Sequence, residues 1–147
     1  MERISLRKEN GVALIIALIM LLILTLIGVS SISTTTFETN ISGNERVGTV
    51  AFYASEAGFQ VALNQLPDTK PIHRTKIGED SYCWSGTPKD KENPKSMKSF
   101  GDYPKAGFDT SWTFKRYQVN ATGESLASMK EVEAQVRYGP FSAGTQY

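Results

Sequence analysis

A long uncharged and mostly apolar run near the start of the chain limits how the chain can fold. No charged residue occurs between Gly11 and Phe37, and residues 12–29 are interrupted only by Thr25 and Gly28. As a helix, residues 12–29 would rise about 27 Å, close to the roughly 30 Å hydrocarbon core of a bilayer. A soluble core helix is a poor alternative, because a helix that is apolar on every side needs a large protein around it.

The residues before this run predict its orientation in a membrane. In residues 1–11, three basic side chains outnumber two acidic ones. Positive charge beside the first apolar segment keeps that end of the chain in the cytoplasm. The chain from Glu38 onward is therefore expected outside the cytoplasm.

Three kinds of processing remain open for the apolar run. A secretory signal peptide would have an apolar region of about 7–15 residues followed by a small-x-small site. This run is longer, although residues 28–30 and 31–33 are passable sites. The second alternative is an uncleaved anchor, and the third is a leader that is cut before the apolar run.

The junction between charged and apolar residues resembles the cleavage site of type IV prepilins. It reads KENG and then VALII over residues 8–16. In that family a short charged leader ends in Gly, and a dedicated membrane peptidase cuts after it and methylates the new N-terminus. The resemblance implies that residues 1–11 are a leader, that Gly11 precedes the cut, and that Val12 is the N-methylated first mature residue.

A longer segment extends the resemblance. Residues 11–66 are similar to the N-terminal region of PilX-type minor pilins, and the stretch AFYASEAG at residues 51–58 is the most telling part. The resemblance implies a structural subunit of a type IV pilus. Its implied partners are the prepilin peptidase, other major and minor pilins contacted through the N-terminal helix, and the inner-membrane assembly machinery. Its implied location is the inner membrane, with a periplasmic C-terminal domain, and the cell-surface pilus.

One position departs from the pattern of the major pilins. They carry Glu at the fifth mature position, where this chain has Ile16. An N-terminal ammonium buried in a filament needs a counter-charge, because an unpaired buried charge is costly. A subunit without the Glu cannot supply that counter-charge to its neighbour. We therefore expect an initiating or tip-associated subunit.

Helical patterning continues to about Leu66, and Pro67 is expected to stop the helix. A stripe of larger apolar residues at helix spacing predicts the face that packs on a head domain: Phe52, Phe59, Leu63 and Leu66. Small residues on the same helix would allow close approach of another element: Ala51, Ala54, Ala57, Gly58 and Ala62. We expect residues 12–37 to form the membrane or filament-core helix, residues 38–66 its amphipathic second half, and residues 67–147 the head.

The head is predicted to be a long connection followed by a strand pair. Residues 67–110 are rich in Pro, Gly and polar residues and predict turns, with a short strand at residues 82–84. Residues 112–121 and 130–138 alternate as half-buried antiparallel strands, with a bulge near Lys115 and a turn at residues 122–125. The tail from Gly139 is expected to be irregular. The predicted class is α+β, a long helix packed on a small antiparallel sheet.

Composition argues against several other functions. The 16 basic and 15 acidic residues balance, so no nucleic-acid partner is expected. His73 and Cys83 are single and lie in the predicted connection, and their pattern matches no metal site or nucleophile motif. We expect no enzyme, cofactor or metal. The remaining alternatives are a membrane-anchored extracytoplasmic binding or adhesion module that uses residues 68–110, and a pseudopilin of a type II secretion system. A secreted enzyme has the least support.

Overall fold

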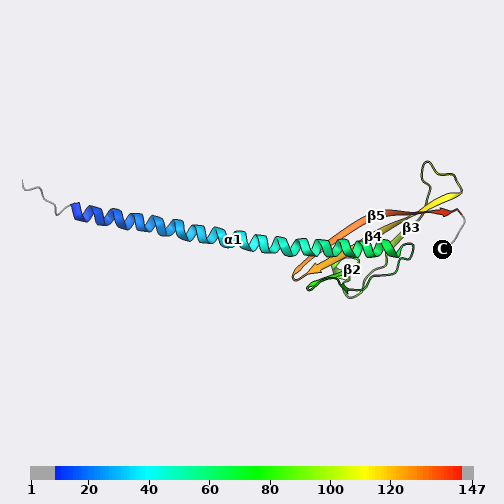
Figure 1. Cartoon of the computed structure of the whole chain (residues 1–147), viewed down its shortest axis with the longest axis horizontal. Coiled ribbons are helices and arrows are strands. Elements are labelled where there is room, and N and C mark those ends of the chain that lie inside the picture. The colour runs from blue at the N-terminus through cyan, green and yellow to red at the C-terminus, as the bar shows by residue number, and fades with distance from the viewer. Residues whose placement is uncertain (1–8, 144–147) are drawn as a thin grey trace, which may run out of the picture. The chain divides into compact units, whose positions relative to one another are not determined.

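The computed structural model describes residues 9–143 and shows an α+β fold, as the sequence predicts. Figure 1 shows one helix followed by the strands of a small antiparallel sheet. The elements are α1 (Glu9–Gln65), β1 (Thr75–Lys76), β2 (Ser81–Ser85), η1 (Pro88–Asp90), β3 (Lys98–Tyr103), β4 (Trp112–Ser125) and β5 (Ser128–Ser142). The described residues fall into two compact units, residues 9–43 and 44–143.

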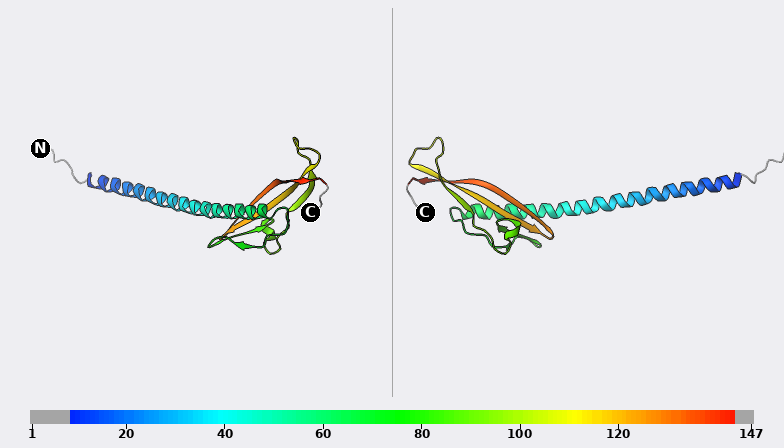
Figure 2. Two further views of the ribbon diagram at one scale, coloured as in Figure 1. Left: turned by 45° about the vertical axis from the view of Figure 1, so that its right-hand side comes forward. Right: turned by 180° about the vertical axis from the view of Figure 1, so that it is seen from behind.

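The sheet is built around β4. Along one edge, β5 pairs with β4 antiparallel from Trp112↔Ser142 to Ser125↔Ser128. The other edge of β4 is shared by β2 and β3, and β1 adds to β2. The two views in Figure 2 show these strands beside the second half of α1. The strands at residues 82–84, 112–121 and 130–138 are thus confirmed, and the predicted bulge lies between Thr113 and Lys115.

Small side chains form the face of α1 that meets the sheet. Ala51, Ala54, Ser55 and Ala62 are each at most 4% exposed. Opposite them, a Cβ added to Gly123 would lie 2.2 Å from the carbonyl oxygen of Ala51 and 2.2 Å from the backbone nitrogen of Ser55. The absence of a side chain at residue 123 therefore lets β4 approach the helix backbone directly.

Larger apolar residues fill the space beyond this contact. The core cluster consists of Ala62, Leu66, Ile72, Met97, Tyr117 and Val119, with Phe59, Leu63 and Val136 packed against it. The predicted stripe is thus only partly right, because Phe52 is 42% exposed. Large side chains on that face would hold the sheet away, so the small residues define the buried face.

Two boundaries differ from those predicted. Residues 122–125 belong to β4 rather than to a turn, and the chain reverses at Leu126 and Ala127, where Leu126 has a φ of 48°. Residues 122–125 are of types that are common in turns. They continue the strand here because Thr122, Gly123 and their neighbours are buried. The tail is not irregular from Gly139, since β5 continues to Ser142.

The predicted connection, residues 67–110, also holds a strand that the sequence does not signal. All six residues of β3 are exposed, so the strand has no alternation of buried and exposed positions. Its backbone pairing with β4 supports it in place of side-chain burial. The connection is therefore a set of short elements rather than a structureless loop.

Glu124 ties this connection to the sheet. Its carboxylate is paired with Arg74 at 2.9 Å and with Lys91 at 2.6 Å. Residue 124 is 8% exposed, and burial alone would raise its pKa, but the hydrogen bonds from Lys91 and Arg74 outweigh burial and lower the pKa. The buried anion thus holds two cations that are far from it in sequence.

The contact at Gly123 gives a first test. Gly123→Ala is expected to cost about 3 kcal/mol or more of folding free energy, because helix and strand must separate to admit a methyl group. Gly48→Ala is the matched control, since its Cβ would meet neighbours no closer than 3.7 Å. It should stabilise by up to about 1 kcal/mol through helix propensity. Thermal melting of the full chain in uncharged detergent measures both variants, and equal melting temperatures would contradict the close packing.

The ion pairs of Glu124 predict a pH dependence. Because the folded-state pKa is lowered, the stabilisation is complete above the unfolded pKa of about 4.3 and is lost as pH falls through the folded pKa. At pH 7, Glu124→Gln should cost about 2 kcal/mol, less than a fully buried pair because the side chains of Arg74 and Lys91 remain 35% and 36% exposed.

Melting temperatures of the two proteins between pH 7 and pH 3 should converge at the acid end. Glu79→Gln, an exposed carboxylate of the same connection, serves as the control and should follow the wild type. A constant gap between wild type and Glu124→Gln at every pH would contradict the ion-pair account.

Candidate assembly helix and processing junction

The first unit of the described chain is a helix whose apolar side chains are uncovered. Between residues 12 and 29 there are fourteen large apolar side chains, each 49–68% exposed. Covering a Leu or Ile side chain stabilises by about 1.5–3 kcal/mol, so even partial burial of fourteen is worth on the order of 20 kcal/mol. Such a surface is stable only against lipid or against other apolar protein.

Length and composition let this helix cross a bilayer. Within the described residues, one helix segment, Gly11–Gln65, is long and apolar enough to do so, and none of its most apolar window is buried in the fold. Its backbone amides and carbonyls bond within the helix, which a spanning segment requires because lipid offers no hydrogen-bond partners.

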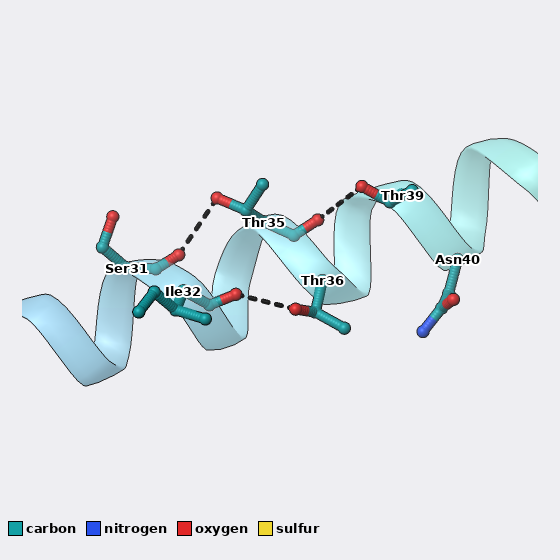
Figure 3. A pocket seen from close by; sticks show the side chains of 6 residues that line it. All are labelled: Ser31, Ile32, Thr35, Thr36, Thr39 and Asn40. Atoms are coloured by element: carbon teal, nitrogen blue, oxygen red, sulfur yellow. Dashed lines mark hydrogen bonds between the residues drawn. The ribbon is translucent and has the colours of Figure 1, made fainter.

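Most hydroxyls in the hydroxyl-rich part of α1 bond to carbonyls of the same helix. Thr35, Thr36 and Thr39 donate to the carbonyls of residues 31, 32 and 35 at 3.1, 2.9 and 2.8 Å. Thr25 donates likewise to Leu22 at 2.8 Å. Figure 3 shows the bonds of Thr35, Thr36 and Thr39 folded back onto the helix, and these residues line a shallow groove together with Ser31, Ile32 and Asn40. Hydroxyls bonded in this way can enter a dry environment without leaving unpaired donors.

The predicted processing residues lie in the first turns of α1. Residues 1–8 of the predicted leader lie outside the described residues. Gly11 is in the helix, with nothing within 4 Å of an added Cβ, and Val12 is 58% exposed. Ile16 follows one turn after Val12 and is 50% exposed. The predicted assembly position is therefore occupied by an exposed apolar side chain.

Other candidate residues do not come together. His73 is exposed, whereas Cys83 is 2% exposed and packs near Gly58. Burial raises the pKa of the Cys83 thiol, which disfavours the reactive thiolate. Across residues 9–143, no group of three His, Cys, Asp or Glu side chains is placed to hold a metal ion. Glu56 is exposed.

Sequence reasoning did not find Glu124 as a structural residue. It lies in a stretch read as a turn, and its partners are 50 and 33 residues away. An acidic residue within a strand is a weak signal of a structural role. Only the folded structure shows that the partners of Glu124 are Arg74 and Lys91.

These features define a class of protein: within residues 9–143, one helix with an uncovered apolar segment long enough to cross a membrane is followed by a small α+β head. Comparison with family models is more specific. Residues 10–60 match the model described as PilX N-terminal, so this part of the chain is similar to the N-terminal domain of PilX-type type IV pilins. Neither a curated protein nor a solved structure matches the chain.

The apolar segment gives a test of membrane anchoring. Met20→Lys with Ile23→Lys places two charges near the middle of the segment, each costing about 2.5–3.5 kcal/mol on insertion scales. We expect the protein to shift from the alkali-resistant membrane pellet to the supernatant or to be degraded. Met20→Leu with Ile23→Leu is the matched control and should remain in the pellet. Full retention of the lysine variant would contradict a membrane-buried segment.

Proposed function

We propose that this protein is a minor pilin, a structural subunit of a type IV pilus that takes part in pilus assembly or initiation. The observation that carries the proposal is the uncovered apolar segment at residues 12–29 within a domain that matches the PilX model. A membrane anchor alone needs such a surface once, against lipid. A pilin needs it twice, first against lipid and then against the helices of other pilins.

The transfer from membrane to filament keeps the segment dry throughout. Because residues 12–29 are uncharged and their one hydroxyl, that of Thr25, bonds to the Leu22 carbonyl of the same helix, leaving lipid for a protein core requires no new polar partners there. Small residues such as Gly28 and Ser31 permit close approach of neighbouring helices. The inner-membrane assembly machinery supplies the energy, and the head stays on the outer side of the membrane.

Processing comes before assembly in this proposal. The prepilin peptidase removes residues 1–11 after Gly11 and methylates the amine of Val12. Removal of the charged leader leaves the single N-methylated ammonium of Val12 in place of several charges. What supports this is the charge pattern on either side of the junction and the domain match that begins at residue 10.

Intact mass and N-terminal sequencing of protein from envelope membranes test the processing step. We expect a chain that starts at N-methylated Val12 in cells that contain the peptidase, and one that retains its leader in cells lacking it. A chain beginning near Ser31 would instead show ordinary secretion and loss of the assembly helix. An intact leader despite an active peptidase would also contradict the proposal.

Ile16 supports a position at the filament tip. A subunit there has no neighbour whose ammonium it must neutralise, so an apolar residue is tolerated at this position. Immunogold labelling of sheared filaments should find the head at filament ends and at low copy number. Even labelling along the shaft at the abundance of the major subunit would contradict the tip assignment.

Replacing Ile16 tests the same point by substitution. In Ile16→Glu the new carboxylate could pair with a neighbour's ammonium, so we expect label to appear within the shaft as well as at the ends. Ile16→Leu is the control that keeps the segment apolar. Unchanged labelling for Ile16→Glu, at equal expression, would show that this position does not set the location.

A further inference from the structure

Strand β5 has an outer edge that no strand of the described chain covers. Its inner edge pairs with β4, and β5 has no second neighbour in the sheet. Figure 1 shows it in orange and red along its side of the sheet. Within residues 9–143, the backbone of residues 130–138 bonds to β4 and to no other segment. About half of the N–H and C=O groups of a strand face each neighbour, so the outward half is open to another strand here.

Proteins usually protect such an edge against pairing with other chains. The common devices are Pro, Lys, inward-pointing charges, bulges and short strands. In β5 they lie at the two ends: Lys130 comes before residues 131–138, and Gly139, Pro140 and the bulge of this strand pair come after them. Residues 131–138, called here the open edge, contain no Pro, Gly or Lys and keep one register with β4 throughout. The middle of β5 is therefore unprotected.

The helix-facing side of the open edge is apolar and only partly covered. Val132, Ala134 and Val136 are half-buried, and each pairs with a residue of β4 that is buried against α1. The apolar core therefore reaches β5 and ends there without full cover. A further strand with apolar side chains on the same face would continue the sheet and cover these residues.

The flank of α1 beside β5 offers a second apolar wall. Phe52 is 42% exposed and lines a groove together with Ser128 and Lys130 at the start of β5. Phe59 lies seven residues further along the same face of the helix, is half-buried, and packs against the core cluster as Val136 does. Apolar side chains of an added strand would therefore meet apolar groups of the helix as well as of the sheet.

The opposite side of the open edge carries two carboxylates without a cation. Glu131 accepts a hydrogen bond from Asn120 at 2.7 Å, and Glu133 accepts one from Gln118. Both donors are neutral amides, and the ion pairs of residues 9–143 include neither glutamate. Side chains directly opposite each other on antiparallel strands interact, and opposite charges there are favourable. A Lys or Arg opposite each glutamate on an added strand would supply the missing cations.

We propose that the open edge binds an extended segment of another protein as an additional antiparallel strand. The segment has apolar residues at alternate positions, which pack on Val132, Val136 and Phe59. Lys or Arg between them pairs with Glu131 and Glu133. In such complexes the main-chain hydrogen bonds supply affinity and the alternate side chains supply specificity. The partner is thus a protein with an exposed strand or tail of alternating apolar and basic residues.

A second copy of this chain fits the open edge less well. Antiparallel pairing of β5 with its own copy places Glu131 opposite Arg137, which matches their charges. Residues 44–65 of α1 run alongside β5, so the same pairing turns this part of the helix in opposite directions in the two copies. Chains anchored in one membrane share one direction. A different protein, whose strand is free to run either way, meets no such conflict.

The inference goes beyond the proposed pilin function and does not depend on it. The head carries the open edge whether the chain is a pilus subunit or a membrane-anchored module. Failure of the processing and labelling experiments would therefore leave this surface unchanged.

Fluorescence anisotropy with the full chain in uncharged detergent and a labelled synthetic peptide tests the proposal. The peptide alternates Val with polar residues and has Lys at the two positions opposite Glu131 and Glu133. Glu131→Lys with Glu133→Lys should weaken its binding about tenfold, because two attractive cross-strand pairs become repulsive. The same variant should bind a second peptide, with Glu at those two positions, about tenfold more tightly than the wild type does. That gain also shows that the variant is folded.

The matched control for charge is Glu79→Lys with Glu92→Lys, which reverses two exposed carboxylates elsewhere in the head. It should change binding of the Lys peptide less than twofold. Two N-methylated forms of the Lys peptide test main-chain pairing on the wild-type protein. Methyl groups on the amides that face β5 should abolish binding, whereas the same number on the alternate amides should leave it nearly unchanged.

Four results would overturn the proposal. The first is absence of binding of the Lys peptide at hundreds of micromolar protein, and the second is equal binding of the two N-methylated forms. The third is an equal loss of binding in the Glu79 and Glu92 control. The fourth comes from sedimentation of the full chain without peptide: a dimer that Glu131→Lys with Glu133→Lys dissociates would assign the open edge to a second copy.

Discussion

The uncovered apolar surface of the first part of α1 is the constraint on which the rest of the molecule depends. Fourteen large apolar side chains between residues 12 and 29 have no partner within the described fold, and leaving them in water would cost more than a small head domain gains by folding. Every other feature of this segment is consistent with a dry environment. It carries no charge, and its one threonine, Thr25, bonds back to the Leu22 carbonyl of its own helix.

The second part of α1 solves a different packing problem. Where the first part presents large side chains outward on all sides, the head-bearing part presents small ones to a single strand, and Gly123 completes the fit. Contact at backbone distance fixes the position of β4, and β4 in turn positions β2, β3 and β5. Because the chain has a single cysteine, it cannot form an internal disulfide. The ion pairs of Glu124 with Arg74 and Lys91 hold the connection between helix and sheet against β4 instead.

Much of this architecture could be predicted from periodicity. The apolar run, the stop at Pro67 and the alternation of residues 130–138 each follow from local physical rules, and they gave the helix, its end and the strand pair. Elements that depend on distant partners could not be found in this way. Strand β3 has no buried face to reveal it, residues 122–125 look like a turn until a helix covers them, and Glu124 acquires its role only from cations elsewhere in the chain.

The proposed pilin function requires that water does not reach the apolar segment, either in the membrane or in the filament. Single-cysteine labelling measures this directly, with Leu22→Cys in a Cys83→Ala background and a charged maleimide applied to membrane vesicles and to sheared filaments. The account predicts that residue 22 stays unlabelled in both and reacts only after the sample is dissolved in SDS. Glu56→Cys, at an exposed position of the head, should react in intact vesicles that present the head to the reagent. Labelling of residue 22 in intact filaments as fast as in SDS would contradict the account.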